Sequence, residues 1–273
     1  MSLAVHDSSY VRALVRERSA IVLDEGKEYL LESRLAPIVR REDLDSIGDL
    51  VGQLRSQPFG DLHARVVEAM TTNETSFFRD AHPFDALQDH IVPELIERRA
   101  GERRLRIWCA ACSSGQEPYS VAMLLRDRFP ELQSWDVEIL GTDLSTEMLE
   151  RARDGAYTTL EVNRGLPARQ LVQNFEQAGP MWRIKAPLRE MAEFRVMNLI
   201  EPWPLLPKMD IVFMRNVLIY FDTETKQDIL AQIRRVLRPD GSLFLGASET
   251  TLNLDPAFER VAYGRASCYR IQS

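Results

Sequence analysis

Two acidic residues occupy positions where the chain could hold a ligand beside a strand. Glu117 closes the loop at residues 111–117, whose sequence is ACSSGQE, and Asp143 closes a later apolar segment. The small residues of this loop let a ligand approach the backbone closely, and the loop carries a carboxylate but no lysine. Such a loop suits a cationic or neutral ligand better than a pyrophosphate.

S-Adenosylmethionine is a ligand of this kind, because it carries a methionyl ammonium and a sulfonium. An acidic side chain at the position of Asp143 can accept hydrogen bonds from both hydroxyls of a ribose. Plainer interpretations stay open for each residue taken singly. Glu117 is then only a charge at a helix N-terminus, and Asp143 is the cap of the next helix.

Other reactive residue types form weaker patterns. Cys109 and Cys112 have the C-x-x-C spacing of a redox pair or of half a zinc site, but no second ligand pair exists. Two small, buried side chains are the favoured interpretation. The four histidines are scattered, and the sequence has no P-loop, no G-x-S-x-G and no H-E-x-x-H motif. We therefore expect no metal.

The elements that must position these residues alternate between strand and helix after residue 104, which predicts a parallel sheet covered by helices. Strands are expected at residues 105–110, 136–142, 209–214 and 242–247. Helices are expected at residues 118–129, from Ser145 or Thr146 to Gly155, and from Asp222 or Thr223 onward. Ligands of open α/β sheets bind at the carboxyl ends of the strands, where the loop at residues 111–117 and Asp143 are expected.

Two segments stand outside this alternation. Residues 10–70 have apolar residues three and four apart, which predicts a small bundle of short helices, separated near Gly48 and at residues 58–60. Pro37 predicts that the helix around Arg34 kinks or begins again there. Residues 157–195 are too long for a single crossover and contain several glycines and prolines, so we interpret them as an inserted subdomain.

The composition limits the possible functions. The chain has 273 residues, 45% of them hydrophobic and 27% charged, which fits an α/β domain with a smaller companion. A formal charge of -7 argues against general binding to nucleic acid, which depends on clustered Lys and Arg. No apolar stretch reaches the roughly 20 residues of a membrane-spanning helix, and no secretory signal is visible. We expect a cytoplasmic protein without membrane insertion.

Five sequence blocks, in order along nearly the whole chain, resemble the CheR-type family of chemotaxis receptor methyltransferases. They are TTNETSFFR at residues 71–79, the segment at 108–120 that ends in GQEPYS, TDLS at 142–145, RNVLIYF at 215–221 and GASE at 246–249. Gln116 departs from the family pattern, because it replaces the first of two glutamates common there. The segment GPMWR at residues 179–183 is shorter than in members that dock a receptor's C-terminal peptide, which argues against tethered docking.

The resemblance implies an α/β fold: a class I (Rossmann-like) methyltransferase domain with a small all-helical N-terminal domain and a small antiparallel β insertion. It divides the chain into a helical domain at residues 1–70, a linker at 71–83 that contributes to the cofactor site, and a methyltransferase domain at 84–273. The insertion lies at about 157–195. The implied cofactor is S-adenosylmethionine, with S-adenosylhomocysteine as product. The implied reaction esterifies glutamate side chains of chemoreceptors for sensory adaptation.

The resemblance also assigns roles to single residues. Arg79 and Tyr220 are implied as the catalytic residues. A salt bridge to Asp80 or Asp85 is the plainer alternative for Arg79, and packing at a strand end is the alternative for Tyr220. The cofactor site that the resemblance implies consists of Asn73, Thr75, Arg79, Gly115, Glu117, Asp143, Asn198, Leu199, Arg215 and Asn216.

Substrate docking is expected on the N-terminal domain. Arg34, Arg40 and Arg41 lie within about two turns of one helix, and in the family this basic helix faces the acidic methylation region of the receptors. The alternative is a solvated helix face, because acidic residues lie nearby and residues 1–70 are not net basic. We expect a monomer whose partner is the cytoplasmic methylation region of chemoreceptors.

Two rival functions share the predicted pocket. A small-molecule carboxyl O-methyltransferase would have a lid in place of a protein-docking surface. A non-catalytic, cofactor-binding signalling scaffold would bind the cofactor without turnover. A nucleic acid amino-methyltransferase is rejected, because RNVL at residues 215–218 lacks the Asn-Pro-Pro-aromatic tetrad of that class.

Overall fold

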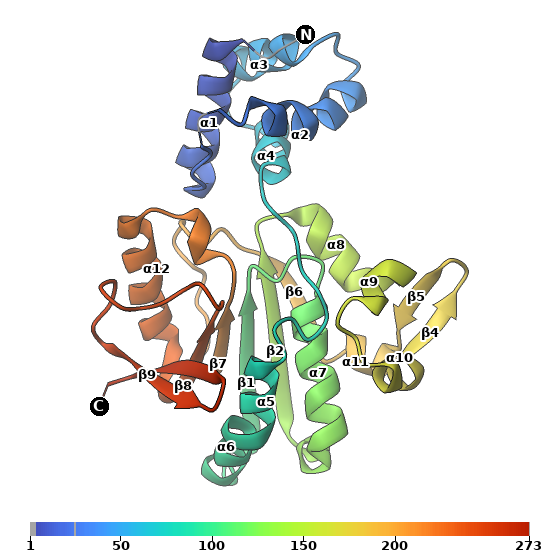
Figure 1. Ribbon diagram of the computed structural model, residues 1–273, viewed down its shortest axis with the longest axis vertical. Helices are drawn as coiled ribbons and strands as arrows, with labels where there is room; N and C mark the ends of the chain where they lie inside the picture. Colours follow the sequence, from blue (N-terminus) through green and yellow to red (C-terminus); the bar gives the residue numbers. More distant parts are fainter. Residues whose placement is uncertain (1–3, 25, 273) are drawn as a thin grey trace. The chain divides into compact units, whose positions relative to one another are not determined.

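The computed structural model describes residues 4–24 and 26–272, which form two compact units (Figure 1). The smaller unit contains the N-terminal residues up to Thr72 together with Tyr220–Thr225. The larger unit contains Asn73–Ile219 and the residues from Lys226 on. Within the described residues, no helix has the length and apolar character needed to cross a membrane.

The smaller unit is built from four short helices, as the sequence predicts: α1 (Val5–Ser19), α2 (Glu28–Arg41), α3 (Ile47–Ser56) and α4 (Asp61–Ala69). Each helix buries one apolar side. The helix does not begin again at Pro37, because α2 continues through this exposed proline. The break expected near Gly48 lies at Ser46, whose Oγ caps α3 by accepting a hydrogen bond from the Asp49 N–H at 3.1 Å.

The larger unit contains a seven-stranded sheet in the order β6-β2-β1-β7-β8-β10-β9. The strands are β1 (Arg104–Ala110), β2 (Asp136–Asp143), β6 (Ala192–Val196), β7 (Met209–Met214), β8 (Leu237–Leu245), β9 (Phe258–Tyr263) and β10 (Ala266–Ile271). The strands from β6 to β8 are parallel, and β9 and β10 form an antiparallel hairpin at the other edge. The predicted parallel sheet is confirmed, although β8 begins and ends earlier than predicted.

Helices cover this sheet, and their ends follow local sequence signals (Figure 1). They are α5 (His82–Ala86), the π-helical turn η1 (Leu87–Ile91), α6 (Val92–Arg98), α7 (Gln116–Arg128), the 3-10 turn η2 (Pro130–Ser134), α8 (Thr146–Asp154) and α12 (Thr223–Val236). Ser145 caps α8 through its Oγ, and Gly155 ends it at a φ of 62°, as predicted.

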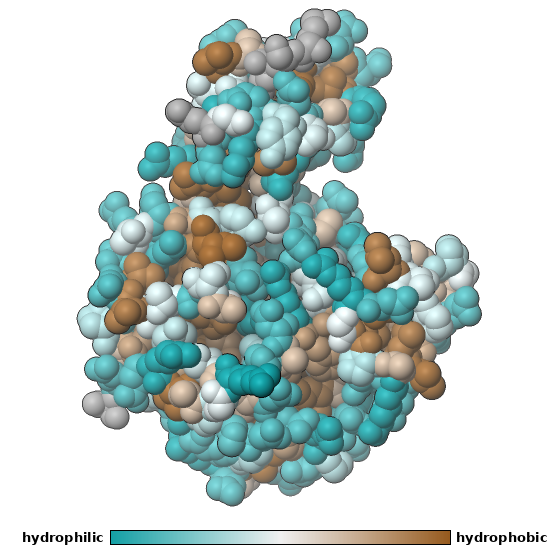
Figure 2. All heavy atoms as spheres, in the orientation of Figure 1, coloured by the Kyte–Doolittle hydropathy of each residue, from teal (hydrophilic) through white to brown (hydrophobic). Residues whose placement is uncertain are grey.

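A second, smaller sheet confirms the predicted antiparallel insertion. Its strands are β3 (Ala156–Thr158), β4 (Phe175–Ala178) and β5 (Met181–Ile184), in the order β3-β5-β4. Helices α9 (Thr159–Asn163), α10 (Ala168–Asn174) and α11 (Ala186–Arg189) accompany it. Hydrophobic side chains reach the surface over this segment (Figure 2), including the exposed Leu160 and Val172. Residues 192–195 of the predicted insertion belong to β6 of the main sheet.

Close packing fixes a glycine in the middle of β2. A Cβ at Gly141 would lie 2.7 Å from the Phe194 ring and 3.0 Å from the Cys112 Sγ, so a side chain cannot be added without displacing its neighbours. Cys112 and Cys109 are free and buried in the apolar core, which confirms their interpretation as small buried side chains.

A buried carboxylate ties the start of β7 to its surroundings. Asp210 Oδ1 accepts a hydrogen bond from Arg99 Nε at 2.8 Å and lies 3.3 Å from Arg238 Nε, and Oδ2 accepts one from the Arg106 backbone N–H at 2.9 Å. Arg99 is itself buried, with a second ion pair to Asp240 at 2.6 Å. Removing Asp210 would therefore leave a buried cation with half of its partners.

We expect Asp210→Ala to lower the free energy of unfolding by about 3 kcal/mol or more, because breaking a buried ion pair leaves an uncompensated charge. Urea unfolding followed by circular dichroism measures this loss. Asp136→Ala, which removes an exposed partner of Arg104, is the matched control and should leave the midpoint almost unchanged. Similar midpoints for the two variants would contradict a structural role for Asp210.

Candidate functional site

Most of the predicted cofactor residues follow the carboxyl ends of four adjacent parallel strands. In the sheet order β6-β2-β1-β7, Asn198 and Leu199 follow β6, Asp143 ends β2, and the loop at residues 111–117 follows β1. Arg215 and Asn216 follow β7 directly. The structure therefore brings these residues to one edge of the sheet, where open α/β sheets bind ligands.

The loop after β1 is held in an unusual backbone conformation. Ala111 and Ser113 have positive φ values of 52° and 51°, and Gly115 has a φ of 91°. A Cβ at Gly115 would lie 2.9 Å from the Cβ of Ala152 on α8, so only glycine fits against that helix. Non-glycine residues with positive φ are strained and cluster at ligand-binding sites.

Asp143 holds this loop to the next one. Its Oδ2 accepts a hydrogen bond from the Ser113 N–H at 2.7 Å, and its Oδ1 accepts one from the Ser145 N–H at 2.9 Å. The second contact is the helix-end role that the plainer interpretation predicted. A carboxylate has lone pairs for about four hydrogen bonds, so these two contacts do not by themselves prevent it from binding hydroxyls.

Glu117 forms a buried ion pair beneath the loop. Arg215 Nη1 donates to Glu117 Oε2 at 2.7 Å. Burial raises the pKa of Glu117 above its usual value, and the nearby positive charges of Arg215 and Arg79 oppose this rise. Oε1 accepts no hydrogen bond from any residue that the structure describes. This oxygen is therefore available to a cationic group of a ligand.

The linker is pinned to the same edge by two hydrogen bonds. Ser113 Oγ donates to the Asn73 carbonyl at 2.9 Å, and the Phe78 N–H donates to Ser120 Oγ, on α7, at 2.9 Å. Thr75 lies between these two anchors and is half-buried. The predicted linker residues are thus attached to the loop after β1 and to the helix that follows it.

Arg79 makes neither of the salt bridges that were its plainer alternative. Its Nη1 donates to the Glu74 carbonyl at 2.9 Å. Asp80 instead pairs with Arg215 at 2.7 Å, and Asp85 lies 3.6 Å from a histidine. Arg215 Nη2 also donates to the Arg79 carbonyl at 2.9 Å. The guanidinium of Arg79 therefore has no carboxylate partner among the described residues.

A carboxylate that sequence reasoning left without a role organises the loops after β7 and β8. Glu249 Oε2 accepts hydrogen bonds from the N–H groups of Asn216, at 2.8 Å, and Gly246, at 2.7 Å, while Oε1 accepts one from the Ile219 N–H at 3.2 Å. A Cβ at Gly246 would lie 2.7 Å from Glu249 Oε2. The signal available in the sequence was an acidic residue closely following a glycine at the end of a strand.

The residues after β6 form a turn of their own. Asn198 Nδ2 donates to Glu201 Oε1 at 3.1 Å, and its Oδ1 accepts a hydrogen bond from the Ile200 N–H at 3.3 Å. Leu199 is buried, and its carbonyl accepts a hydrogen bond from Trp203 Nε1 at 3.1 Å. These contacts fix the turn beside the end of β2, where Asp143 lies.

Tyr220 lies in the smaller unit. It ends the 3-10 helix η3 (Leu218–Tyr220), is half-buried, and accepts a hydrogen bond at its carbonyl from the Val22 N–H at 3.1 Å. Its neighbour Ile219 is held by Glu249 through the hydrogen bond described above.

The three predicted docking arginines differ in their surroundings. Arg34 donates to the Met70 carbonyl and, at 3.1 Å, to Thr72 Oγ1, so it holds the end of the helical unit. Arg40 and Arg41 are exposed, and their side chains have no hydrogen bond or ion pair with the described residues. These two side chains are thus available to a partner, while two donors of Arg34 are already engaged.

Comparisons with known proteins agree along the whole chain. Residues 7–71 match the all-alpha domain of CheR methyltransferases, and residues 73–266 match their SAM binding domain. A chemotaxis protein methyltransferase of Pseudomonas aeruginosa is 44% identical over 275 residues, which cover 99% of each chain. One of Pseudomonas putida is 42% identical and covers 96% of each chain. One of Escherichia coli is 36% identical over 94% of this chain and 89% of its own.

We expect Glu249→Ala to loosen the loops after β7 and β8, because it leaves three N–H groups without their acceptor, at about 1–3 kcal/mol for each buried group. Hydrogen exchange should become faster at the Asn216 and Ile219 amides, and urea unfolding should show reduced stability. Glu224→Ala, at an exposed position in α12, is the control. Unchanged exchange at both amides would show that Glu249 does not organise these loops.

Proposed function

This chain belongs to the CheR methyltransferase family, and on that premise we propose how its residues carry out S-adenosylmethionine-dependent methylation of chemoreceptor glutamates. The enzyme is a protein-glutamate O-methyltransferase. The observation that supports the proposal best is the convergence of the loop at residues 111–117, Asp143 and Arg215 at the carboxyl edge of adjacent parallel strands.

The acidic groups at this edge fit the cofactor. Glu117 Oε1 is available to the methionyl ammonium, and Asp143 is placed to accept hydrogen bonds from the ribose hydroxyls. Asn73, Thr75, Asn198, Leu199 and Asn216 would complete the pocket, as the resemblance implies. When bound, S-adenosylmethionine supplies a methyl group on a positively charged sulfur.

The acceptor needs no general base. A glutamate side chain has an ordinary pKa of about 4.3 and is ionised at neutral pH. Its carboxylate oxygen forms the new bond to the methyl carbon, the carbon–sulfur bond breaks with its electron pair on sulfur, and no proton is transferred. The products are a glutamate methyl ester and S-adenosylhomocysteine.

Catalysis then depends on position and desolvation. Arg79 has no carboxylate partner among the described residues, so its guanidinium can orient the incoming carboxylate by paired hydrogen bonds. Tyr220 can donate a hydrogen bond to the reacting carboxylate or line the path of the methyl group. These two residues are the proposed catalytic residues.

We further propose that residues 1–70 form the helical domain that docks the receptor. Residues 71–83 then form the linker, and residues 84–273 form the methyltransferase domain. The enzyme acts as a cytoplasmic monomer. The partner is the cytoplasmic methylation region of chemoreceptors. A radiolabelled methyl-transfer assay on receptor cytoplasmic fragments and on small carboxylic acids, with base-labile release of the label, separates this function from both rivals.

We expect Tyr220→Phe to reduce kcat for receptor methylation much more than the affinity for S-adenosylhomocysteine, because the proposed contact of its hydroxyl is to the reacting groups and not to the adenosine. Asp143→Asn should do the opposite and weaken cofactor affinity by about 1.5–3 kcal/mol, the worth of a hydrogen bond to a charged group. Calorimetry and the methyl-transfer assay measure both quantities. Equal losses of kcat and affinity in Tyr220→Phe would make Tyr220 a binding or folding residue.

Charge reversal at Arg40 and Arg41 should raise KM for the receptor and leave cofactor affinity unchanged, because both side chains are exposed and free to meet an acidic partner. The attraction should fade with salt, since the screening length shortens to roughly 3 Å at 1 M ionic strength. The KM of the unaltered enzyme should therefore rise with salt, whereas that of the variant should fall, because salt also screens the repulsion that charge reversal creates. No change in KM at low salt would rule out docking at these two arginines.

A further inference from the structure

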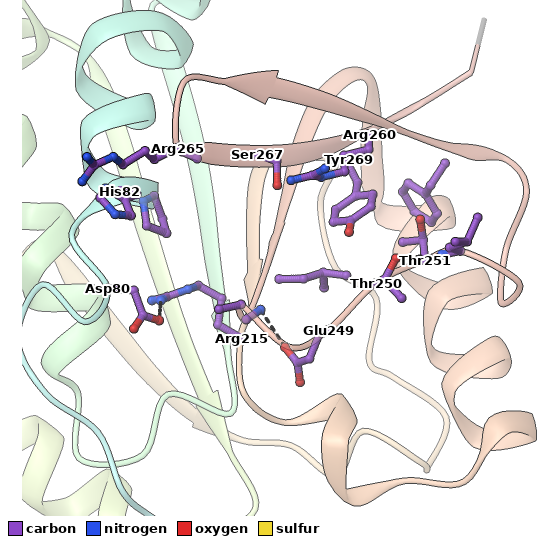
Figure 3. A pocket seen from close by; sticks show the side chains of 17 residues that line it. Asp80, His82, Arg215, Glu249, Thr250, Thr251, Arg260, Arg265, Ser267 and Tyr269 are labelled. Atoms are coloured by element: carbon purple, nitrogen blue, oxygen red, sulfur yellow. Dashed lines mark hydrogen bonds and ion pairs between the residues drawn. The ribbon is translucent and has the colours of Figure 1, made fainter.

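A cavity of about 480 Å³ lies in the larger unit beside the proposed cofactor edge, where β8 ends (Figure 3). Arg265, Arg260, Ser267 and Tyr269 lie along one wall, and Asp80, Arg215 and Glu249 lie along the opposite wall. Of these residues, only Arg215 belongs to the proposed cofactor site. The first wall comes from the hairpin of β9 and β10, to which the sequence analysis gave no role.

The alternation of side chains along β9 and β10 puts residues that line the cavity on one face of the hairpin. Side chains two residues apart in a strand share a face, as Phe258 and Arg260 do on β9 and Ser267 and Tyr269 do on β10. Arg260 is paired directly with Tyr269 across the hairpin. The floor of the cavity is apolar and buried around Phe258 and Tyr269, whereas Arg260 and Arg265 are exposed at its rim. Strongly hydrophilic side chains are also visible over this hairpin in Figure 2.

The two rim arginines are the unpaired charges of this cavity. The side chain of neither Arg260 nor Arg265 makes a hydrogen bond or an ion pair with another described residue. The acidic groups of the opposite wall are already engaged, because Asp80 pairs with Arg215 and Glu249 accepts three backbone hydrogen bonds. An occupant would therefore meet two guanidinium groups without an ionic partner, whereas each carboxylate of the opposite wall already has one or more partners.

Arg215 connects this cavity to the proposed cofactor site. It lines the cavity, and its Nη1 donates to Glu117 below the loop after β1. A group bound in the cavity would thus lie close to the edge where the acceptor glutamate must react. The chain as a whole carries a charge of -7, so an acidic partner approaching this edge depends on local positive groups.

We propose that this cavity binds an acidic side chain of the substrate protein, near the glutamate that is methylated, through Arg260 and Arg265. The proposal rests on the receptor-methylation function above and adds a specificity subsite to it. Because both arginines are exposed, a carboxylate can reach them while the backbone of the substrate residue that carries it stays outside the cavity. The cavity has room for such a side chain with some of its water, since one water occupies about 30 Å³ of liquid.

The test is a double variant, Arg260→Gln with Arg265→Gln, assayed on a soluble receptor cytoplasmic fragment. KM should rise by about three- to tenfold, the effect of losing two exposed ion pairs, with kcat and S-adenosylhomocysteine affinity unchanged. Arg126→Gln with Arg128→Gln removes the same charge at the end of α7 and is the matched control. Thermal unfolding verifies that all variants are folded.

A second fragment, with the acidic residues around the methylated glutamate changed to glutamine, makes the test specific. The unaltered enzyme should show the higher KM with this fragment, and the Arg260/Arg265 variant should no longer distinguish the two fragments. Equal discrimination by both enzymes, or an equal rise in KM in the control, would overturn the proposal while leaving receptor methylation intact.

Direct binding of the two fragments, measured by fluorescence anisotropy with S-adenosylhomocysteine present, separates the subsite from the reaction. If the unaltered enzyme methylates neither fragment, the receptor-methylation function fails. The subsite then stands only if the unaltered enzyme binds the acidic fragment more tightly and the double variant loses that preference. Equal binding of both fragments by the unaltered enzyme would refute it.

Discussion

The ion pairs of the buried Arg215 guanidinium are the interactions on which the proposed cofactor edge depends. Its side chain is only 2% exposed, yet it reaches Glu117 in the first turn of α7 and both Asp80 and the Arg79 carbonyl in the linker. A buried cation is tolerated only when its partners are in place. Burial of Arg215 at the end of β7 therefore requires two partners. The linker must bring Asp80 close to β7, and the first turn of α7 must bring Glu117 there.

Glu249 is a buried anion that holds together the neighbouring loops after β7 and β8, as Arg215 is a buried cation that holds the linker to α7. One buried carboxylate gathers three N–H groups from the ends of β7 and β8, including that of Asn216, whose φ is 59°. Positive φ values also occur at Phe78, Asp80 and Ala81 in the linker. Such conformations persist only where surrounding contacts hold them. Glu249 holds Asn216 and Arg215 holds Asp80, while Ser120 holds Phe78.

The elements were predictable because their signals are local. Alternation of strand and helix, the serine that caps α8 and the glycine that ends it lie within short windows of sequence. The start of β8 was not predictable in this way. Pro239 and Gly241 indicate a turn, but the strand begins at Leu237, paired with Met209, and accommodates them where its register against β7 shifts.

The site was predictable only as a set of motifs. The contacts that organise it join residues far apart in the chain: Asp80 and Arg215 are 135 positions apart, and Glu249 and Asn216 are 33 apart. The family resemblance implied Arg215 as a cofactor residue, and the sequence offered Asp80 or Asp85 as a salt-bridge partner for Arg79. The choice between those two arginines depends on tertiary structure, which brings the end of β7 to the linker.

The desolvation seen at Glu117 is also the condition that the reaction favours. Burial raises the pKa of this carboxyl, because a buried charge is less stabilised by water. Methyl transfer from a sulfonium to a carboxylate neutralises both charges, so separated ions lose more from desolvation than the transition state does. The direct ion pair with Arg215 opposes the rise in the pKa of Glu117. The same pair thus places a carboxylate at an edge where both ionic partners are largely buried.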